Sequence, residues 1–241
     1  MAVMKVVQAP NEVLNNLAKE VTFKESGLAK LLLDMEETLV KHTNPPGVGL
    51  AAPQVGVGLR IFLAKLGSWE MDKKGRHSPV SKHTSSSAEA EGLLSRGELD
   101  PYQEGTRGRI EVFINPKILE VSGDTSKDKV ERKTAEGCLS LKDFYGDVRR
   151  GTKVKIRYQT VDLDKLRMQK SGVRIQNLIE KREKIYMRLE ARIMQHETDH
   201  LQGKLFTARV LEQQGRLYQV EKDNKGREVF VPVEIDGSGW N

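Results

Sequence analysis

The chain of 241 residues is 37% hydrophobic and 31% charged, which predicts a soluble globular protein with one large or two small domains. No stretch approaches the roughly 18 consecutive apolar residues of a membrane span, and the N-terminus lacks the apolar core of a signal peptide, so we expect a cytoplasmic protein without a membrane partner. The net charge of +6 is modest, and most basic residues alternate with acidic ones as on a solvated surface, so we expect no DNA partner.

The first part of the chain predicts short elements around one clear helix. Apolar residues at three- and four-residue spacing predict a helix over residues 26–42, with Ser26 as its N-cap and Asn44-Pro45-Pro46 ending it. The flanking elements are a strand at residues 3–7, a turn at Pro10, a short helix at about 13–19 and a strand at 59–66.

Residues 47–56 read Gly-Val-Gly-Leu-Ala-Ala-Pro-Gln-Val-Gly, so a backbone can approach a ligand closely here. The stretch lacks the Lys-Ser/Thr ending of a phosphate-binding loop, and taken alone it favours a tight helix-to-strand connection. Gln54 is its one polar side chain, and a buried amide needs hydrogen-bond partners.

Two polar stretches and a C-terminal hairpin follow. Residues 67–108 are rich in Ser, Gly, Lys and Glu, which predicts a long surface insertion with exposed His77 and His83. A second polar insertion is expected at about 163–184, with its latter part helical. The remaining predicted elements are a strand at 110–121, broken at Asn115-Pro116, a strand at 148–161, and a hairpin at about 217–235.

Residues 195–200 contain the pattern His-Glu-x-x-His. Residues four apart lie on one face of a helix, so His196 and His200 can direct two imidazoles at one ion, and Glu197 can reach a water on that ion. The pattern also occurs by chance on solvated helix faces. Apolar spacing and Gly203 at a C-cap position favour a partly buried helix over about 186–202.

A catalytic zinc-type site usually has three protein ligands and an open fourth position. Cys138 is the only cysteine, so no intrachain disulfide forms, and a lone cysteine is more often a small buried hydrophobe. It lies among small and polar neighbours, and a thiolate there would suit a first-row transition ion.

Three stretches together resemble the peptide deformylase family: Gly-Val-Gly-Leu-Ala-Ala-Pro-Gln, Glu-Gly-Cys-Leu-Ser and Gln-His-Glu-Thr-Asp-His-Leu. The resemblance covers most of the chain outside the two insertions and the hairpin. It implies one catalytic domain over residues 1–241 of the α+β class, with mixed or antiparallel sheets packed around a central metal-binding helix. Further matches lie at Pro10, Leu14, Ala18, Val21 and Asn115-Pro116.

The resemblance also implies the site residues. Cys138, His196 and His200 would hold one divalent ion per chain, with Fe²⁺ expected and Zn²⁺, Ni²⁺ or Co²⁺ able to replace it. Glu197 would take a proton from water and deliver it to the leaving amine. The oxyanion would be bound by the Gln54 amide and the Leu139 backbone N–H.

The implied substrate is the N-formyl-methionyl end of a newly made polypeptide, and the implied products are formate and a free amino terminus. The substrate backbone would pair with Val48, Gly49 and Gly137, and its methionine side chain would lie near Leu189 and Ile193. We expect a monomer, and the sequence leaves any contact with the ribosome near its exit tunnel undetermined.

Three other functions compete with this interpretation. A metallopeptidase would explain the helix but leave Cys138 and Gln54 without a role. A non-catalytic binding module would not need the full ligand set and Glu197. A hydrolase with Cys138 as nucleophile would need a third orienting residue, which is not evident.

Overall fold

The computed structural model describes residues 2–42, 47–67, 69–71, 77–79, 109–123, 135–168, 174–224 and 226–234. The chain divides into two units, one of residues 1–64 and 112–241 and one of residues 65–111. In the second unit, β3 (Trp69–Met71) and β4 (His77–Pro79) form an antiparallel pair within the predicted insertion. The rest of that insertion after residue 67, including His83, lies outside the described residues, as does the side chain of His77.

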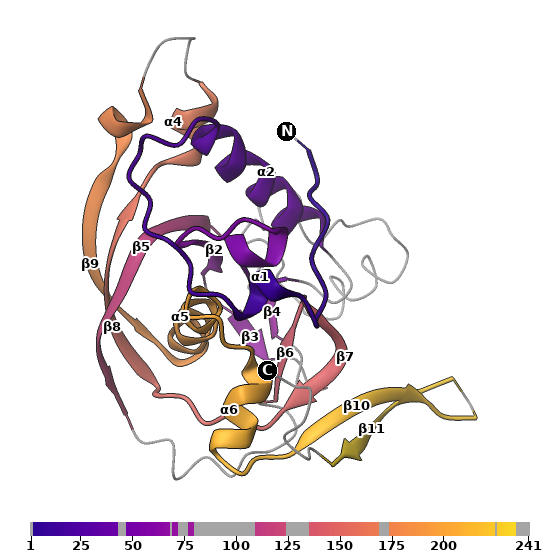
Figure 1. Ribbon diagram of the computed structural model, residues 1–241. Coiled ribbons are helices and arrows are strands. Elements are labelled where there is room, and N and C mark those ends of the chain that lie inside the picture. The colour runs from indigo at the N-terminus through magenta and orange to yellow at the C-terminus, as the bar shows by residue number, and fades with distance from the viewer. Residues whose placement is uncertain are drawn as a thin grey trace, which may run out of the picture. The chain divides into compact units, whose positions relative to one another are not determined.

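Two sheets carry most of the described strands (Figure 1). Their described pairings are antiparallel, which confirms an α+β fold with antiparallel sheets. The five-stranded sheet has the order β1 (Gly49–Ala51), β2 (Ile61–Leu66), β5 (Arg109–Ser122), β8 (Lys153–Thr160) and β9 (Glu180–Met187). The four-stranded sheet has the order β11 (Glu228–Val233), β10 (Leu217–Lys222), β7 (Leu141–Gly146) and β6 (Glu136–Cys138).

The helical segments are mostly short. They are α1 (Glu12–Asn15), α2 (Leu28–Lys41), α4 (Leu163–Arg167), α5 (Arg188–Leu201), α6 (Phe206–Glu212) and the 3-10 turns η1 (Ala52–Val55) and η3 (Ile175–Leu178). Within the described ranges, no helix combines the length and apolar character that crossing a bilayer requires.

Helix α5 contains the His-Glu-x-x-His pattern and packs against β1, β8, β9 and η1 (Figure 1). The predicted helix is therefore confirmed, with ends within two residues of those expected. Gly203 follows it with a φ of 68°, and the Gly203 N–H donates to the His200 carbonyl at 3.2 Å. A glycine in this left-handed conformation is a common way to end a helix.

Aromatic side chains fill the core under the five-stranded sheet. The Phe62 and Phe113 rings stack with centroids 4.5 Å apart, and Tyr158 lies 4.4 Å beyond Phe113. The Tyr158 and Tyr186 hydroxyls are 2.8 Å apart and share a hydrogen bond. These contacts join β2, β5, β8 and β9 into one buried layer, since aromatic pairs and satisfied hydroxyls stabilise a core.

The predicted strand at residues 3–7 is wrong. Backbone donors of this extended segment bond to other partners: Ala2 N–H to Asp34 Oδ1 at 2.7 Å, and Met4 N–H to Thr38 Oγ1 at 2.8 Å. The segment therefore lies along α2. The Asp34 and Thr38 side chains of α2 accept the backbone hydrogen bonds that a neighbouring strand would otherwise accept.

The start of α2 also differs from the prediction. Its N-cap is Gly27, with a φ of 83° and no side-chain cap, so Ser26 does not cap the helix. The helix ends at Lys41, and the predicted terminator Asn44-Pro45-Pro46 lies outside the described residues. The short helix predicted at about 13–19 is a single turn, α1, capped by the Asn11 side chain.

The predicted break in the strand at Asn115-Pro116 is a bulge inside the continuous strand β5. Asn115 has a φ of 49°, and the register against β8 shifts between Ile114 and Lys117. The Asn115 side chain exchanges two hydrogen bonds with the Val21 backbone, at 2.8 and 2.9 Å. The irregular residue is thus stabilised by a segment distant in sequence.

The latter part of the second polar insertion was expected to be helical, but its only described helical element is the 3-10 turn η3, and its last residues belong to a strand. Residues 180–187 form β9, paired with β8 along its whole length. Glu183 bonds across the pair to Lys155 and Arg157, both at 2.8 Å. Charged side chains on the exposed face of β9 obscure the alternation of apolar and polar residues by which a strand is recognised in a sequence. The hairpin predicted at about 217–235 is confirmed as β10 and β11, although residue 235 lies outside the described range.

Candidate metal centre

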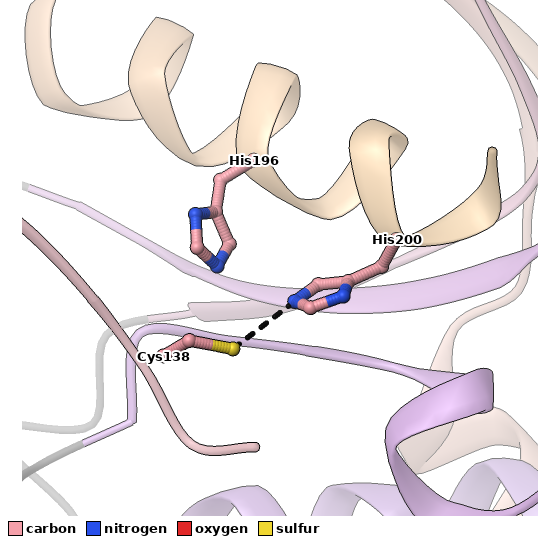
Figure 2. A group of neighbouring side chains, drawn as sticks. All are labelled: Cys138, His196 and His200. Carbon is pink, nitrogen blue, oxygen red and sulfur yellow. Dashed lines mark hydrogen bonds between the residues drawn. The ribbon is translucent and has the colours of Figure 1, made fainter. Parts of the chain in front are cut away.

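Cys138, His196 and His200 come together in the structure (Figure 2). Both imidazoles project from α5 toward the thiol at the end of β6. Their candidate ligand atoms all lie within 4.8 Å of one another, and the Cys138 Sγ is 3.3 Å from His200 Nε2. The three residues could therefore hold one ion.

The donor set and the spacing between Cys138 and His200 fit a first-row transition ion. Zinc-type bond lengths of about 2.3 Å to sulfur and 2.0–2.1 Å to nitrogen place tetrahedral ligand atoms about 3.3–3.8 Å apart. The Cys138–His200 separation of 3.3 Å lies in that range. His196 Nδ1 contacts Glu136 Oε2 at 3.1 Å, which leaves Nε2 for the ion in the manner of metal-binding histidines.

The charges around Cys138 favour its thiolate. Burial alone would raise the pKa of the thiol, but the positive charges of His200 and His196 and their hydrogen bonds lower it to about 5. The thiolate is the form that binds metals. The same thiolate and Glu136 raise the pKa of His196 well above its usual value, against the effect of burial.

Glu197 is a buried carboxyl group beside the two histidines. Burial raises its pKa to about 7, although the His196 and His200 charges oppose the shift. Its Oε2 atom has no hydrogen-bond partner among the described residues. A carboxyl group with a pKa near neutrality and a free oxygen can accept and return a proton.

Gly49 lies directly against that carboxyl group. A Cβ atom at Gly49 would be 2.2 Å from Glu197 Oε1 and 2.7 Å from its Cδ. The sequence indicated that a ligand could approach the backbone closely here, whereas the structure shows that the neighbour of Gly49 is the Glu197 side chain. Only glycine fits this position without moving Glu197.

Gln54 and Leu139 lie next to the thiol. Gln54 is only 2% exposed, and its Oε1 accepts a hydrogen bond from the Ala51 N–H at 2.8 Å. This contact directs Nε2 toward the Cys138 Sγ, 3.4 Å away. Leu139 directly follows Cys138 in the turn between β6 and β7.

The N-terminal segment donates hydrogen bonds to the backbone of Gln54 and of the turn that contains Leu139, which the sequence did not predict. The Val7 N–H donates to the Gln54 carbonyl at 2.8 Å, and the Ala9 N–H donates to the Ser140 carbonyl at 2.8 Å. Between them, Gln8 Nε2 donates to the Leu139 carbonyl at 2.9 Å. Three consecutive residues thus connect η1 to the turn that carries Cys138.

The residues expected to bind substrate lie on three elements. Val48 precedes the short strand β1, in which Gly49 is the first residue, and Gly137 lies exposed in β6. Leu189 and Ile193 lie on α5, and with His196 and His200 they follow a spacing of four, three and four residues. That spacing places all four on one helix stripe. Their roles toward substrate stay predictions.

A buried ionic network behind the histidines was missed by the sequence analysis. Arg150 bonds to Glu136 at 2.9 Å and to Asp199 at 2.5 Å, and Arg209 bonds to Asp199 at 2.6 Å. The charge of Arg150 keeps the pKa of Glu136 low although burial opposes this. Glu136 and Asp199 lie inside the two motifs, but nothing in the sequence distinguishes Arg150 and Arg209 among 40 basic residues.

We expect Glu136→Gln to weaken metal binding by about 10- to 100-fold, as is typical when a carboxylate supporting a ligand histidine is lost. The glutamine keeps the shape but carries no charge to balance Arg150, and it has only one acceptor oxygen where Glu136 uses two for Arg150 and His196. Competition with a calibrated chelator measures the change. Glu212→Gln is the control, because Glu212 pairs with Arg209 at the surface. Equal metal affinity in wild type and Glu136→Gln would contradict the role.

The chain is similar in sequence to known proteins of one family. The family model described as polypeptide deformylase matches residues 3–216. The chain is 33% identical to peptide deformylase 1 of Bacillus anthracis over 87% of this chain and 94% of the relative. It is 34% identical to peptide deformylase 1 of Bacillus subtilis over 87% and 91%.

Solved structures show the same similarity. A Met-Ala-Ser-bound class I type b peptide deformylase from Acinetobacter baumannii matches with a TM-score of 0.55 and 26% identity, covering 86% of this chain and 98% of the other. A peptide deformylase from Synechococcus elongatus in complex with actinonin matches with a TM-score of 0.54 and 25% identity, covering 86% and 78%.

Proposed function

The chain belongs to the polypeptide deformylase family, and from this premise we infer that it is a hydrolase that removes the N-formyl group from the N-terminal formyl-methionine of newly synthesised polypeptides and releases formate. The observation that carries the inference is the meeting of a thiol from β6 with two imidazoles from α5, beside a buried carboxyl group. A metal site with a thiolate ligand explains Cys138, which a metallopeptidase would leave without a role.

Cys138, His196 and His200 would hold one divalent ion, and the single thiolate among them favours a first-row transition metal. Fe²⁺ is the metal we propose, with Zn²⁺, Ni²⁺ or Co²⁺ as substitutes. When bound, such an ion acts as a Lewis acid that activates water for attack at neutral pH. Helix α5 would provide two of the three ligands from its central position in the fold.

The residues around the centre divide the remaining chemistry. Glu197 accepts a proton from the attacking water and returns it to the leaving amine, which its raised pKa supports. Gln54 Nε2 and the Leu139 backbone N–H donate to the oxygen of the formyl group as it becomes negative. One well-placed donor of this kind contributes about 3–4 kcal/mol to the transition state. The Ala51 contact supports the role of Gln54, because it fixes the amide.

The substrate would bind as an extended chain between two strand edges. Val48 and Gly49 would pair with its backbone on one side and Gly137 on the other. Leu189 and Ile193, on the same helix stripe as the histidines, would line an apolar pocket for the methionine side chain. A monomer, a single domain over residues 1–241 and a cytoplasmic location stay predictions, and so does any contact of the hairpin with the ribosome.

The proposed function is tested by formate release from formyl-Met-Ala-Ser after anaerobic purification, with metal content measured on the same sample. We expect turnover in proportion to bound metal. Unmodified Met-Ala-Ser and longer unformylated peptides should remain intact. Cleavage of those peptides without formate release would favour a metallopeptidase instead, and a metal-free, inactive protein would favour a binding module.

Gly49→Ala should lower kcat for the formylated peptide by about 10- to 100-fold, since misplacing a catalytic group by about 1 Å can cost that much. The new methyl group would overlap Glu197 Oε1, so the carboxyl group must move away. Metal content should stay at the wild-type level, because no ligand is displaced. Gly58→Ala is the control, because a Cβ there meets no atom within 4 Å. Wild-type kcat in Gly49→Ala would contradict this arrangement.

A further inference from the structure

The four-stranded sheet has two different faces. The strand register pairs Glu136 with Gly146 and Gly146 with Leu217, so these residues share one face. On that face a Cβ at Gly146 would meet Val210 and Phe206 of α6, and Leu217 belongs to the same buried cluster. This face is therefore covered by the protein itself.

The opposite face carries aromatic side chains. Gly137 pairs with Tyr145, Tyr145 pairs with Tyr218, and Val220 pairs with Phe230, so all lie on this second face. The Tyr145 and Phe230 rings meet edge to face with centroids 5.4 Å apart, and Tyr218 lies 6.4 Å from Phe230. Phe230 remains 37% exposed. We call Tyr145 and Phe230 the aromatic wall.

The aromatic wall begins directly beside Gly137. A Cβ atom on Gly137 would be 2.7 Å from Tyr145 Cε1, so the Tyr145 ring covers the place where a side chain would stand. Gly137 is exposed, and β6 is the last strand of its sheet among the described residues. A peptide added along this edge would run past the Tyr145 ring.

Side chains alternate between the two faces of an extended strand, and this alternation determines which substrate residue can contact the aromatic wall. Glu136 contacts His196, on the face turned toward α5, where the methionine side chain is proposed to bind. Side chains of successive residues in an extended peptide point to opposite faces. The residue after formyl-methionine therefore points to the face of Gly137 and Tyr145.

We propose that Tyr145 and Phe230 form a binding site for the side chain of the residue that follows formyl-methionine, and that this site selects large apolar or aromatic side chains. The inference rests on the proposed function and extends it to the sequence of the nascent chain. Phe230 comes from β11, so the C-terminal hairpin gains a role in substrate choice.

The test compares kcat/KM for formyl-Met-Xaa-Ser with Xaa as Phe, Leu or Gly. In the wild type we expect the Phe peptide to exceed the Gly peptide by about 10-fold, a common discrimination for an apolar pocket. Phe230→Ala should reduce that ratio to about 2-fold through a higher KM for the Phe peptide. Its turnover of the Gly peptide should stay at the wild-type value, which also shows that the variant is folded.

Val229→Ala is the matched control. Val229 has the same 37% exposure but pairs with Glu221 on the opposite face of the hairpin, so its loss should leave the ratio at about 10. Tyr145→Phe should also keep the ratio, because the ring remains. An unchanged ratio in Phe230→Ala, an equal loss for both peptides, or a wild type without preference overturns the inference. A wild type that releases no formate from any peptide refutes the proposed function itself.

Discussion

Glu197→Gln should keep the bound metal and lower kcat for formyl-Met-Ala-Ser by about 10²- to 10⁴-fold, the usual contribution of a positioned acid-base group. Glutamine has nearly the same shape, so its contact with Gly49 is preserved, but it cannot accept the proton. Formate release and metal content measured on one sample separate loss of chemistry from loss of metal. A variant with wild-type kcat would rule out Glu197 as the general base.

The pH dependence gives an independent readout of the same residue. Burial raises the pKa of Glu197 to about 7, and a nearby cation shifts the pKa of a carboxyl group downward. The rate in the wild type should rise as pH increases through the pKa of the loaded enzyme, because the carboxylate is the active form. Glu197→Gln should lose this rise. Glu183→Gln, which alters only the surface ion pairs of Glu183 with Lys155 and Arg157, should retain it.

Cys138→Ala should bind metal at least about 100-fold more weakly than the wild type, since it would remove one of the three proposed protein ligands and the only thiolate. The sulfur lies 3.3 Å from His200 Nε2, and no other thiol exists in the chain. Cys138→Asp should retain part of the metal with weaker activity, because a carboxylate can replace the thiolate as an anionic ligand. Metal content after dialysis against a chelator measures both effects.

Ser140→Ala is the control for that experiment. Ser140 lies two residues along the same turn, and its buried Oγ has no hydrogen-bond partner in the part of the chain described. Its substitution should leave metal content unchanged. Full metal content in Cys138→Ala would contradict the ligand role, and formate release by that metal-loaded variant would also exclude Cys138 as a nucleophile.

Local patterns were enough for several elements of the fold. The apolar spacing and the glycine after it predicted α5, and the turn residues predicted the hairpin of β10 and β11. The same signals failed at β9, where charged residues cover the exposed face of the strand, and at residues 3–7, where helix side chains replace a strand partner. The strand β6 and the helix α6 are too short for a periodic signal.

The sequence by itself determined the motifs: an i, i+4 histidine pair, one thiol, one amide among apolar and small neighbours, and a resemblance that links them. Helix geometry alone brings His196 and His200 together, because it acts over four residues. Only the tertiary structure decided that Cys138 meets them across 62 positions, that Glu136 and Arg150 support His196, and that Gly49 touches Glu197. These contacts depend on strand pairing and packing between distant segments, which leave no periodic trace in the sequence.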